Sequence, residues 1–491
     1  MRKPDTLRER AAQLIFPRLG SNMPPAVPAH DDVERVLGML ETTPVGGLVL
    51  FRGLAERAPE ALQRLQEASR TPLLIAADLE RGAGQQLAGL TVFPHAMAQG
   101  HAGEEAVEQA AFTTAAEARS VGVHWLFAPV ADVHSNPANP IISTRAFGSE
   151  PRECGKLVAA FVRGARRGGG LSTAKHFPGH GDTDTDSHDV LPTVSTDRRG
   201  LDRTELVPFR AAIEAGVDAV MTAHVAYPAL DPSGTAATFS APILRTVLRD
   251  QLGFQGVVVS DSLLMGGAGS AVAARAPELV SAGVDVLLDV SHPDVALSSL
   301  LRAVADGSLP ESLIHEAFER IWAMKLRVRG GAPEPPKEAR SLARDIARRA
   351  LVVEGALPSG RPPIVLIRPH TDYPDPTRAD AVEILGSVGS TIHPVGPDTA
   401  ESDLTAALEA VRQAGACVLV LIVKPAAWHS FGLLPWQARF AERIISDVPS
   451  VVCCLGSPDA DRNLPSPAAR VLAFSDVEVS VRAVADLLAA P

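Results

Sequence analysis

The sequence predicts an α/β fold in which a (β/α)8 TIM-type barrel is followed by a smaller α/β sandwich domain. Three observations lead to the barrel. Short apolar runs alternate with longer segments of helical character through residues 1–290, a pattern typical of parallel strands joined by crossover helices. Seven or eight such runs in a stretch of this length fit a barrel better than an open sheet. Nearly every run also ends in a polar or ionisable residue, and barrel active sites lie at the carboxyl ends of the strands.

The expected barrel strands are seven apolar runs, and a weaker eighth candidate lies at 14–17. The polar residues at or just past the ends of these runs are Asp78, Asp132, His176, His224, Asp261 and Asp289, and we expect them to share a pocket. The seven runs are Gly47–Phe51, Leu73–Asp78, Trp125–Val130, Leu171–His176, Ala219–His224, Val257–Asp261 and Val284–Asp289.

A chain of 491 residues should hold at least two domains, because single hydrophobic cores stop growing near about 250–300 residues. We predict a catalytic barrel over 1–330, a linker and connecting helix over 331–350, and a C-terminal α/β domain over 351–491. The Gly- and Pro-rich segment RGGAPEPPK follows a predicted helix at Glu311–Arg327 and precedes another near Ala339–Val353. The expected strands of the last domain are Ile364–Arg368, Cys417–Val423, Val451–Leu455 and Val471–Phe474.

Composition excludes several classes of function. The net charge of −11 argues against nucleic acid as a partner, which usually requires a basic patch. No apolar run reaches the roughly 18 residues of a membrane helix, and the N-terminus lacks the apolar core of a signal peptide. We therefore expect a cytoplasmic protein with no membrane partner. The four cysteines are too few for a disulfide framework and are expected to be buried, reduced thiols.

The segment KHFPGHGDTDTDSHDVLP, residues 175–192, is the richest in chemistry. Gly179 and Gly181 permit positive φ angles and a close approach of the backbone to other groups. Asp186 and His188 are two residues apart, so one loop can deliver both to a pocket. A carboxylate bound to an imidazole fixes the ring tautomer and supports its charge during proton transfer. This pairing predicts an enzyme.

A metal site is the alternative interpretation of this segment. The Asp-rich stretch resembles the start of a calcium loop, but Ser187 replaces the glycine and Thr193 the glutamate that such a loop needs. A zinc site would need His176 and His180 on one helix face, and Pro178 and Gly179 between them break a helix. We expect no metal and no organic cofactor.

Three further clusters carry ionisable groups at predicted strand ends. Asp261, in VVVSDSLLMGGA, is equally compatible with a helix N-cap and with a nucleophile that attacks an anomeric carbon. Asp78 in DLERG, and Asp132 with Arg145 in the following cluster, suit the recognition of sugar hydroxyls. Salt bridges between surface loops explain each of these two clusters equally well.

The histidine segment, TRAFG, VMTAHVAYPALD, LGFQGVVVSDSLLMGGA and the DLERG element together resemble glycoside hydrolase family 3, in its β-N-acetylglucosaminidase branch. The likeness covers about residues 1–330. It implies a retaining mechanism through a covalent glycosyl-enzyme, with Asp261 as nucleophile and His188 as acid/base in a dyad with Asp186. It further implies that the sugar-binding residues are Asp78, Arg145, Lys175 and His176, that Met265 lies near the sugar, and that Asp132, His180 and His224 are pocket candidates.

The predicted protein is an exo-acting β-N-acetylglucosaminidase whose partner is a small glycan derived from peptidoglycan or chitin. Because a histidine acid/base removes one negative charge from the site, an anion such as phosphate could attack the intermediate, giving phosphorolysis beside hydrolysis. The alternatives are a β-glucosidase or β-xylosidase of the same family, or a non-catalytic sugar-binding protein.

Two departures from the family pattern stand out. An arginine often expected near Gln86 is missing, with Arg81 as a candidate to compensate, and Ser262 occupies a position where a second acidic residue is frequent.

Overall fold

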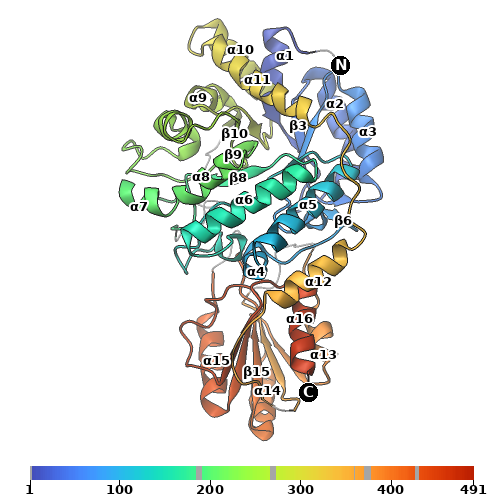
Figure 1. The fold of residues 1–491 in the computed structure, drawn as a ribbon, viewed down its shortest axis with the longest axis vertical. Helices are drawn as coiled ribbons and strands as arrows, with labels where there is room; N and C mark the ends of the chain where they lie inside the picture. The colour runs from blue at the N-terminus through green and yellow to red at the C-terminus, as the bar shows by residue number, and fades with distance from the viewer. Residues whose placement is uncertain are drawn as a thin grey trace.

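The computed structural model describes residues 3–183, 191–265, 272–358, 360–369, 377–425 and 431–490. Within these residues, eight parallel strands close into a barrel in the first part of the chain, when β1 and β2, separated by Pro17, are counted as one strand (Figure 1). The pairing of Ile15 with Leu287 joins the first strand to the last. The fold class predicted from the sequence is confirmed. The strands are β1 (Ile15–Phe16), β2 (Arg18–Leu19), β3 (Gly47–Leu50), β5 (Leu74–Ala77), β7 (Trp125–Leu126), β8 (Thr173–Phe177), β9 (Ala219–Thr222), β10 (Val257–Val259) and β11 (Leu287–Leu288), with a small side pair, β4 (Gly53–Leu54) and β6 (Leu87–Ala88).

All seven predicted barrel runs contain a strand, and the weaker eighth run contains β1. The regular strands are shorter than the runs, most visibly at Trp125–Val130, where β7 covers two residues. Pro129 lies in this run, and a proline has no N–H to donate to the sheet. Phe127 and Ala128, which follow β7, are nevertheless buried in the barrel core.

Helices surround the barrel, as expected for strands joined by crossover connections (Figure 1). Helix α11 has the bounds predicted from its sequence. The barrel helices are α1 (Leu7–Ala12), η1 (Ala29–Asp31), α2 (Val33–Thr42), α3 (Ala58–Ala68), η2 (Ala83–Gln85), α4 (Ala96–Ala102), α5 (Glu104–Ser120), η3 (Ser143–Arg145), α6 (Pro151–Arg167), α7 (Arg198–Arg203), α8 (Leu206–Glu214), η4 (Ala237–Phe239), the π-type η5 (Pro242–Gln251), η7 (Val272–Arg275), α9 (Ala276–Ala282), α10 (Pro293–Ala305) and α11 (Glu311–Arg327).

The C-terminal domain is a six-stranded sheet covered by helices on both faces, in the order β12-β17-β16-β15-β13-β14 within the described residues. All neighbours pair in parallel except β12 and β17. Its elements are α12 (Ala339–Arg349), β12 (Val352–Gly355), β13 (Ile364–Ile367), α13 (Ala381–Gly386), β14 (Ile392–Val395), α14 (Glu401–Ala414), β15 (Cys417–Leu421), α15 (Pro435–Asp447), β16 (Ser450–Cys454), β17 (Ala469–Leu472) and α16 (Glu478–Ala489).

Alternate residues of the central strands enter two separate cores. On β13, Val365 and Ile367 pack with α14 and α15, whereas Ile364 and Leu366 pack with α13 and α16. Successive strand side chains point to opposite faces, so a strand covered on both faces is apolar throughout. This explains why β13, β15 and β16 were visible in the sequence as uninterrupted apolar runs.

Two features of this domain correct the sequence prediction. The helix expected over Ala339–Val353 ends at Arg349, because the β-branched pair Val352 and Val353 forms β12 and pairs antiparallel with β17. Strand β14 was not predicted. It contains Pro394, which is tolerated there because β14 is an edge strand.

The two domains touch through apolar packing and ring stacking. Ala343 and Ile346 of α12 share a buried cluster with Phe93 and with alanines of α4 and α5. The ring of His101, in α4, stacks on Phe474 with 4.0 Å between the ring centroids. Figure 1 shows α12 lying between the barrel and the C-terminal sheet. The C-terminal domain therefore packs against the barrel through α4 and the residues next to it.

Two expectations from composition can be compared with the structure. All four cysteines are buried free thiols, as predicted. Among the described helices, none combines the length and apolarity needed to cross a membrane.

Candidate active site

Most of the predicted site residues lie at the carboxyl ends of the barrel strands. Asp78 directly follows β5, Lys175 and His176 lie in β8, and Asp261 follows β10. Arg145 ends the short helix η3, in the long connection after β7. The parallel barrel directs these ends to one mouth, so residues far apart in sequence converge there.

Lys175 is the centre of a buried ionic cluster. Its Nζ atom donates to Asp78 Oδ1 at 2.8 Å and lies 2.7 Å from Glu80 Oε1. Arg145 donates to the same Glu80 carboxylate through two nitrogens, Nε to Oε2 at 3.0 Å and Nη2 to Oε1 at 2.8 Å. Two cations and two carboxylates thus form one network, and the planar guanidinium of Arg145 binds Glu80 in the bidentate manner that its geometry favours.

This cluster stays ionised despite its burial. Burial alone would raise the pKa of Glu80, but Arg145 and Lys175 hold it well below the ordinary glutamate value. Burial would lower the pKa of Lys175, and the charges of Asp78 and Glu80 raise it instead. The side chain of Asp78 is 32% exposed and that of Lys175 is 3% exposed. Asp78 is therefore the member of the pair that a ligand can reach most readily.

Asp132 anchors the first part of the histidine segment. Its carboxylate, with no exposed surface, accepts from His176 Nδ1 at 2.7 Å and from the backbone N–H of His180 at 2.7 Å. The backbone N–H of His176 also donates to it, at 3.2 Å. With Nδ1 facing Asp132, the Nε2 atom of His176 lies 3.4 Å from Arg145 Nη2, on the side of the ionic cluster. Asp132 thus orients the ring of His176 so that its Nε2 atom faces the ionic cluster.

The side chain of His180 is buried and contacts Thr183. Its Nδ1 lies 2.8 Å from Thr183 Oγ1, and burial lowers the pKa of the ring to about 4. In the described part of the chain, no group of three or more His, Cys, Asp and Glu side chains has the arrangement of a metal site. His180 and His176 share Asp132 as a partner, which accounts for their proximity.

The glycines of this segment are required by close packing. Gly179 has a φ of 133°, and a Cβ atom there would meet the carboxylate of Glu205. A Cβ atom at Gly181 would collide with the carbonyl oxygen of Val133. Glu205 itself is 2% exposed and accepts from Ser135 Oγ at 3.1 Å. Burial, and next the charge of Asp132, raise the pKa of Glu205 to about 8, so its carboxyl group is largely protonated at neutral pH.

Asp261 is held by the residue that follows it. The backbone N–H of Ser262 donates to Asp261 Oδ1 at 2.7 Å, and the Ser262 carbonyl accepts from His224 Nε2 at 3.1 Å. The other ring nitrogen of His224 lies 2.8 Å from Thr238 Oγ1. His224 therefore supports the segment that carries Asp261, and its contact with a sugar stays a prediction.

The surroundings of Asp261 favour its ionised form. Burial would raise the pKa of Asp261, but His176 and His224, then the N–H of Ser262 and the charge of Lys175, lower it below the ordinary aspartate value. A carboxylate that stays ionised at neutral pH is available as a nucleophile.

Ser262 also links Asp261 to a second ion pair. Its hydroxyl donates to Asp289 Oδ2 at 2.7 Å. Arg18, in β2, donates to both oxygens of the same carboxylate, at 2.7 and 2.6 Å. Asp289 was expected at the pocket as a strand-end residue. In the structure, Asp289 is linked to Asp261 through Ser262, which donates a hydrogen bond to each carboxylate.

The remaining predicted residues fall into three groups. Met265 lies in the turn after Asp261, with its N–H bonded to the Ser262 carbonyl at 3.1 Å. Asp186 and His188, the predicted dyad, lie outside the described residues. The guanidinium of Arg81 contacts His95 at 3.0 Å and Thr377 of the C-terminal domain at 2.9 Å, and its compensation for an arginine near Gln86 stays a prediction. Gln86 binds the backbone N–H of Arg52 and the side chain of Asn22, both at 3.3 Å.

Sequence reasoning did not select Glu80 and Arg18 as site residues. Glu80 was visible in the DLERG element, two residues beyond Asp78, but a carboxylate at that place is equally consistent with a surface salt bridge. Arg18 lies in the strand with the weakest pattern, and its partner Asp289 is 271 residues away. Local spacing carries no signal for such a pair.

The sequence of this chain is similar to those of several known proteins. The model of the glycosyl hydrolase family 3 N-terminal domain matches residues 6–324. A beta-hexosaminidase of Methylococcus capsulatus is 40% identical over 268 residues, which are 53% of this chain and 79% of that protein. A beta-N-acetylglucosaminidase/beta-glucosidase of Cellulomonas fimi is 35% identical over 294 residues, 57% of this chain, and the match spans only about half of that protein, 52% of its length.

A solved structure extends the likeness to both domains. The glycoside hydrolase family 3 beta-N-acetylglucosaminidase of Paenibacillus sp. str. FPU-7 superimposes with a TM-score of 0.86 at 31% identity. The match covers 99% of this chain and 97% of the Paenibacillus chain. The arrangement of a barrel followed by an α/β sandwich is therefore shared with that enzyme.

Proposed function

The chain belongs to glycosyl hydrolase family 3, and we propose that it is a retaining exo-β-N-acetylglucosaminidase that releases a non-reducing terminal GlcNAc from glycans derived from peptidoglycan or chitin. The names of the relatives from Methylococcus and Paenibacillus support this substrate class. The observation that carries the proposal is that Asp261 follows β10, at the carboxyl end of the barrel strands, where the N–H of Ser262 donates to its carboxylate at 2.7 Å and its pKa is lowered. A binding module needs no such carboxylate.

In the proposed mechanism, Asp261 attacks the anomeric carbon and forms a glycosyl-enzyme. His188, oriented by Asp186, protonates the leaving oxygen and then activates the water that releases the sugar. Asp78, Arg145, Lys175 and His176 hold the ring hydroxyls, to which carboxylates and cations offer complementary acceptors and donors. The lowered pKa of Asp261 keeps its carboxylate ionised before the attack, and the charge returns when water cleaves the glycosyl-enzyme ester.

A comparison of aryl β-GlcNAc and aryl β-glucoside turnover, with Asp261→Ala alongside the unaltered chain, tests the assignment. We expect faster GlcNAc release that the substitution abolishes. Equal or faster glucoside release would make the chain a β-glucosidase, an alternative that the double name of the Cellulomonas relative favours. The β-xylosidase alternative is tested with the aryl β-xyloside in the same assay. Turnover of none of the three substrates would make it a sugar-binding protein.

Phosphorolysis is a second activity that this site could support. A neutral histidine in place of a carboxylate acid/base residue removes one negative charge that would repel an anion near the intermediate. With phosphate present, we expect GlcNAc 1-phosphate to form beside free GlcNAc. Turnover that is indifferent to phosphate, with no sugar phosphate by ³¹P NMR, would exclude the activity.

We place this activity in peptidoglycan turnover in the cytoplasm. The sequence expectation of a cytoplasmic chain and the substrate class named for its relatives support this placement. Fractionation of the source cells tests this placement, and we expect the chain in the cytoplasmic fraction. Recovery of the chain from the medium or the cell envelope would contradict the placement.

A further inference from the structure

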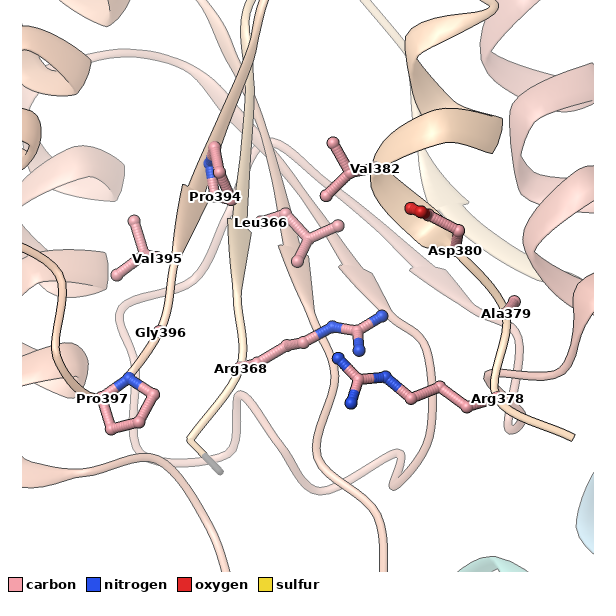
Figure 2. Close-up of a pocket in the computed structure, with 10 residues that line it drawn as sticks. All are labelled: Leu366, Arg368, Arg378, Ala379, Asp380, Val382, Pro394, Val395, Gly396 and Pro397. Atoms are coloured by element: carbon pink, nitrogen blue, oxygen red, sulfur yellow. The ribbon is translucent and has the colours of Figure 1, made fainter. Parts of the chain in front are cut away.

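A cavity of about 530 Å³ opens at the carboxyl ends of β13 and β14, in the C-terminal domain (Figure 2). Its size is within the range of small-molecule sites. Apolar side chains from both strands and from α13 form its walls, among them Leu366, Val382 and Pro394. This combination of apolar walls and a few polar groups is typical of a ligand pocket.

Two arginines supply most of the polar groups. Arg368 directly follows β13 and Arg378 lies just before α13, and Figure 2 shows their guanidinium groups pointing toward one another across the cavity. Asp380 is the acidic residue among the lining side chains, and its Oδ1 atom caps α13 by accepting from the N–H of Glu383 at 3.0 Å. Two guanidinium groups therefore face the same cavity from its two sides.

The position in the sheet agrees with a binding role. The chain leaves β13 for β14 on one side and returns to β15 on the other, so β13 lies where the strand order reverses. In doubly wound sheets, ligands bind beyond the carboxyl ends of the strands, in the crevice between the two strands where the order reverses, here β13 and β15. The pocket lies on the other side of β13, toward β14 and α13, and shares with that crevice the carboxyl end of β13. Arg368 stands directly at the end of β13.

We propose that this pocket binds an oxyanion, a carboxylate or phosphate group of a small molecule, between Arg368 and Arg378. Guanidinium forks bind both groups through paired N–H donors. The apolar walls provide contact for the carbon skeleton that carries the anion.

One hydrogen bond links the segment beside the pocket to the barrel. Thr377, next to Arg378, accepts a hydrogen bond from Arg81 at 2.9 Å, and Arg81 directly follows Glu80 of the ionic cluster. The anion could thus belong to the distal end of a glycan held in the barrel or to a separate molecule. The first of these sources rests on the proposed function, whereas the second does not.

Calorimetric titration with inorganic phosphate and with glutarate, in the presence of saturating GlcNAc to occupy the barrel, tests binding directly. Arg368→Ala and Arg378→Ala should each weaken binding of one or both anions about tenfold or more, since each removes charge-assisted hydrogen bonds. Arg412→Ala is the matched control. It removes an arginine of the same domain that pairs with Asp447 at 2.6 Å and does not line the pocket, and its affinities should not change.

The source of the anion is resolved by steady-state kinetics on two aryl β-GlcNAc substrates, one neutral and one with a carboxylate on the aglycone. A KM raised by Arg368→Ala for the charged substrate alone identifies the glycan as the source. Anion binding lost in the variants with both KM values unchanged identifies a separate ligand. If anion affinities and both KM values are the same in the two variants and the control, the proposal is overturned, and this outcome leaves the turnover that defines the proposed function intact.

Discussion

The hydroxyl of Ser262 donates to Asp289 Oδ2 at 2.7 Å, while the backbone N–H of Ser262 donates to Asp261 Oδ1 at the same distance. One residue thus binds two carboxylates, one at the barrel mouth and one paired with Arg18 behind it. Asp289 lies at the end of a different strand, so Ser262 links the segments that follow β10 and β11.

Ser262→Ala should lower kcat about tenfold and change KM little. The substitution removes a hydrogen bond to a charged group, worth about 1.5–3 kcal/mol, and frees the segment that positions the carboxylate of Asp261. Steady-state kinetics with an aryl β-GlcNAc measures both constants. Ser262→Thr keeps the hydroxyl and should retain more of kcat. Equal losses in the two variants would show that the hydroxyl is not responsible.

Lys175→Met should destabilise the fold by about 3–5 kcal/mol, because it removes a buried cation: Asp78 loses its ammonium partner and Glu80 keeps only Arg145. It should also raise KM, since Asp78 loses the group that holds it. Denaturant unfolding and steady-state kinetics measure the two effects. Lys156→Met is the matched control, since Lys156 pairs with Glu153 at 2.6 Å on the surface, where both side chains are about 60% exposed. A cost below about 1 kcal/mol is expected there. Similar costs in both variants would contradict the assigned role of Lys175.

Glu205→Gln should stabilise the protein in a pH-dependent way. The pKa of Glu205 is about 8 in the fold, raised first by burial, against roughly 4.3 in an unfolded chain. The folded chain keeps a proton that the unfolded chain releases, so the contribution of Glu205 to stability is present below about pH 4 and is lost as the pH rises towards 8. Glutamine has no proton to lose. Its advantage in Tm should therefore reach about 2 °C or more at pH 8 and shrink towards pH 4.

The same measurement on Glu60→Gln, at an exposed position of α3, serves as the control for this pH dependence. Because the side chain of Glu60 is exposed, the Tm difference between Glu60→Gln and the unaltered chain should be small at every pH. A Tm difference for Glu205→Gln that is constant between pH 4 and 8 would contradict the buried, protonated carboxyl.

The sequence predicted which residues lie at the strand ends, and it did not predict the partners that come from elsewhere in the chain. Asp78, Lys175, His176 and Asp261 follow apolar runs, and barrel topology alone brings them to one mouth. The functions of Asp132 and Asp289 could not be deduced from the same pattern. Both follow strands, yet one turns back to hold the histidine segment and the other binds Arg18. Only the packing of the loops decides between facing the pocket and supporting it.

The fold shows the same division. Strands such as β13 and β15 are apolar throughout because both faces are buried, and their sequences predict them well. The edge strands β12 and β14 lie at the ends of the C-terminal sheet and carry polar, proline or exposed residues. Their pairing is determined by the strand beside them, β17 or β13, so local pattern predicted a longer helix in one case and nothing in the other.

Mass spectrometry of a trapped glycosyl-enzyme tests the central claim, that Asp261 is the nucleophile, most directly. The chain is incubated with a fluorinated N-acetylglucosaminyl fluoride whose glycosyl-enzyme hydrolyses slowly, and is then digested and sequenced by tandem mass spectrometry. We predict one sugar per chain, attached to the peptide that contains Asp261 and absent from Asp261→Ala. A label on another carboxylate, such as Asp132 or Glu205, or unlabelled protein that releases GlcNAc with inverted anomeric configuration, would contradict it.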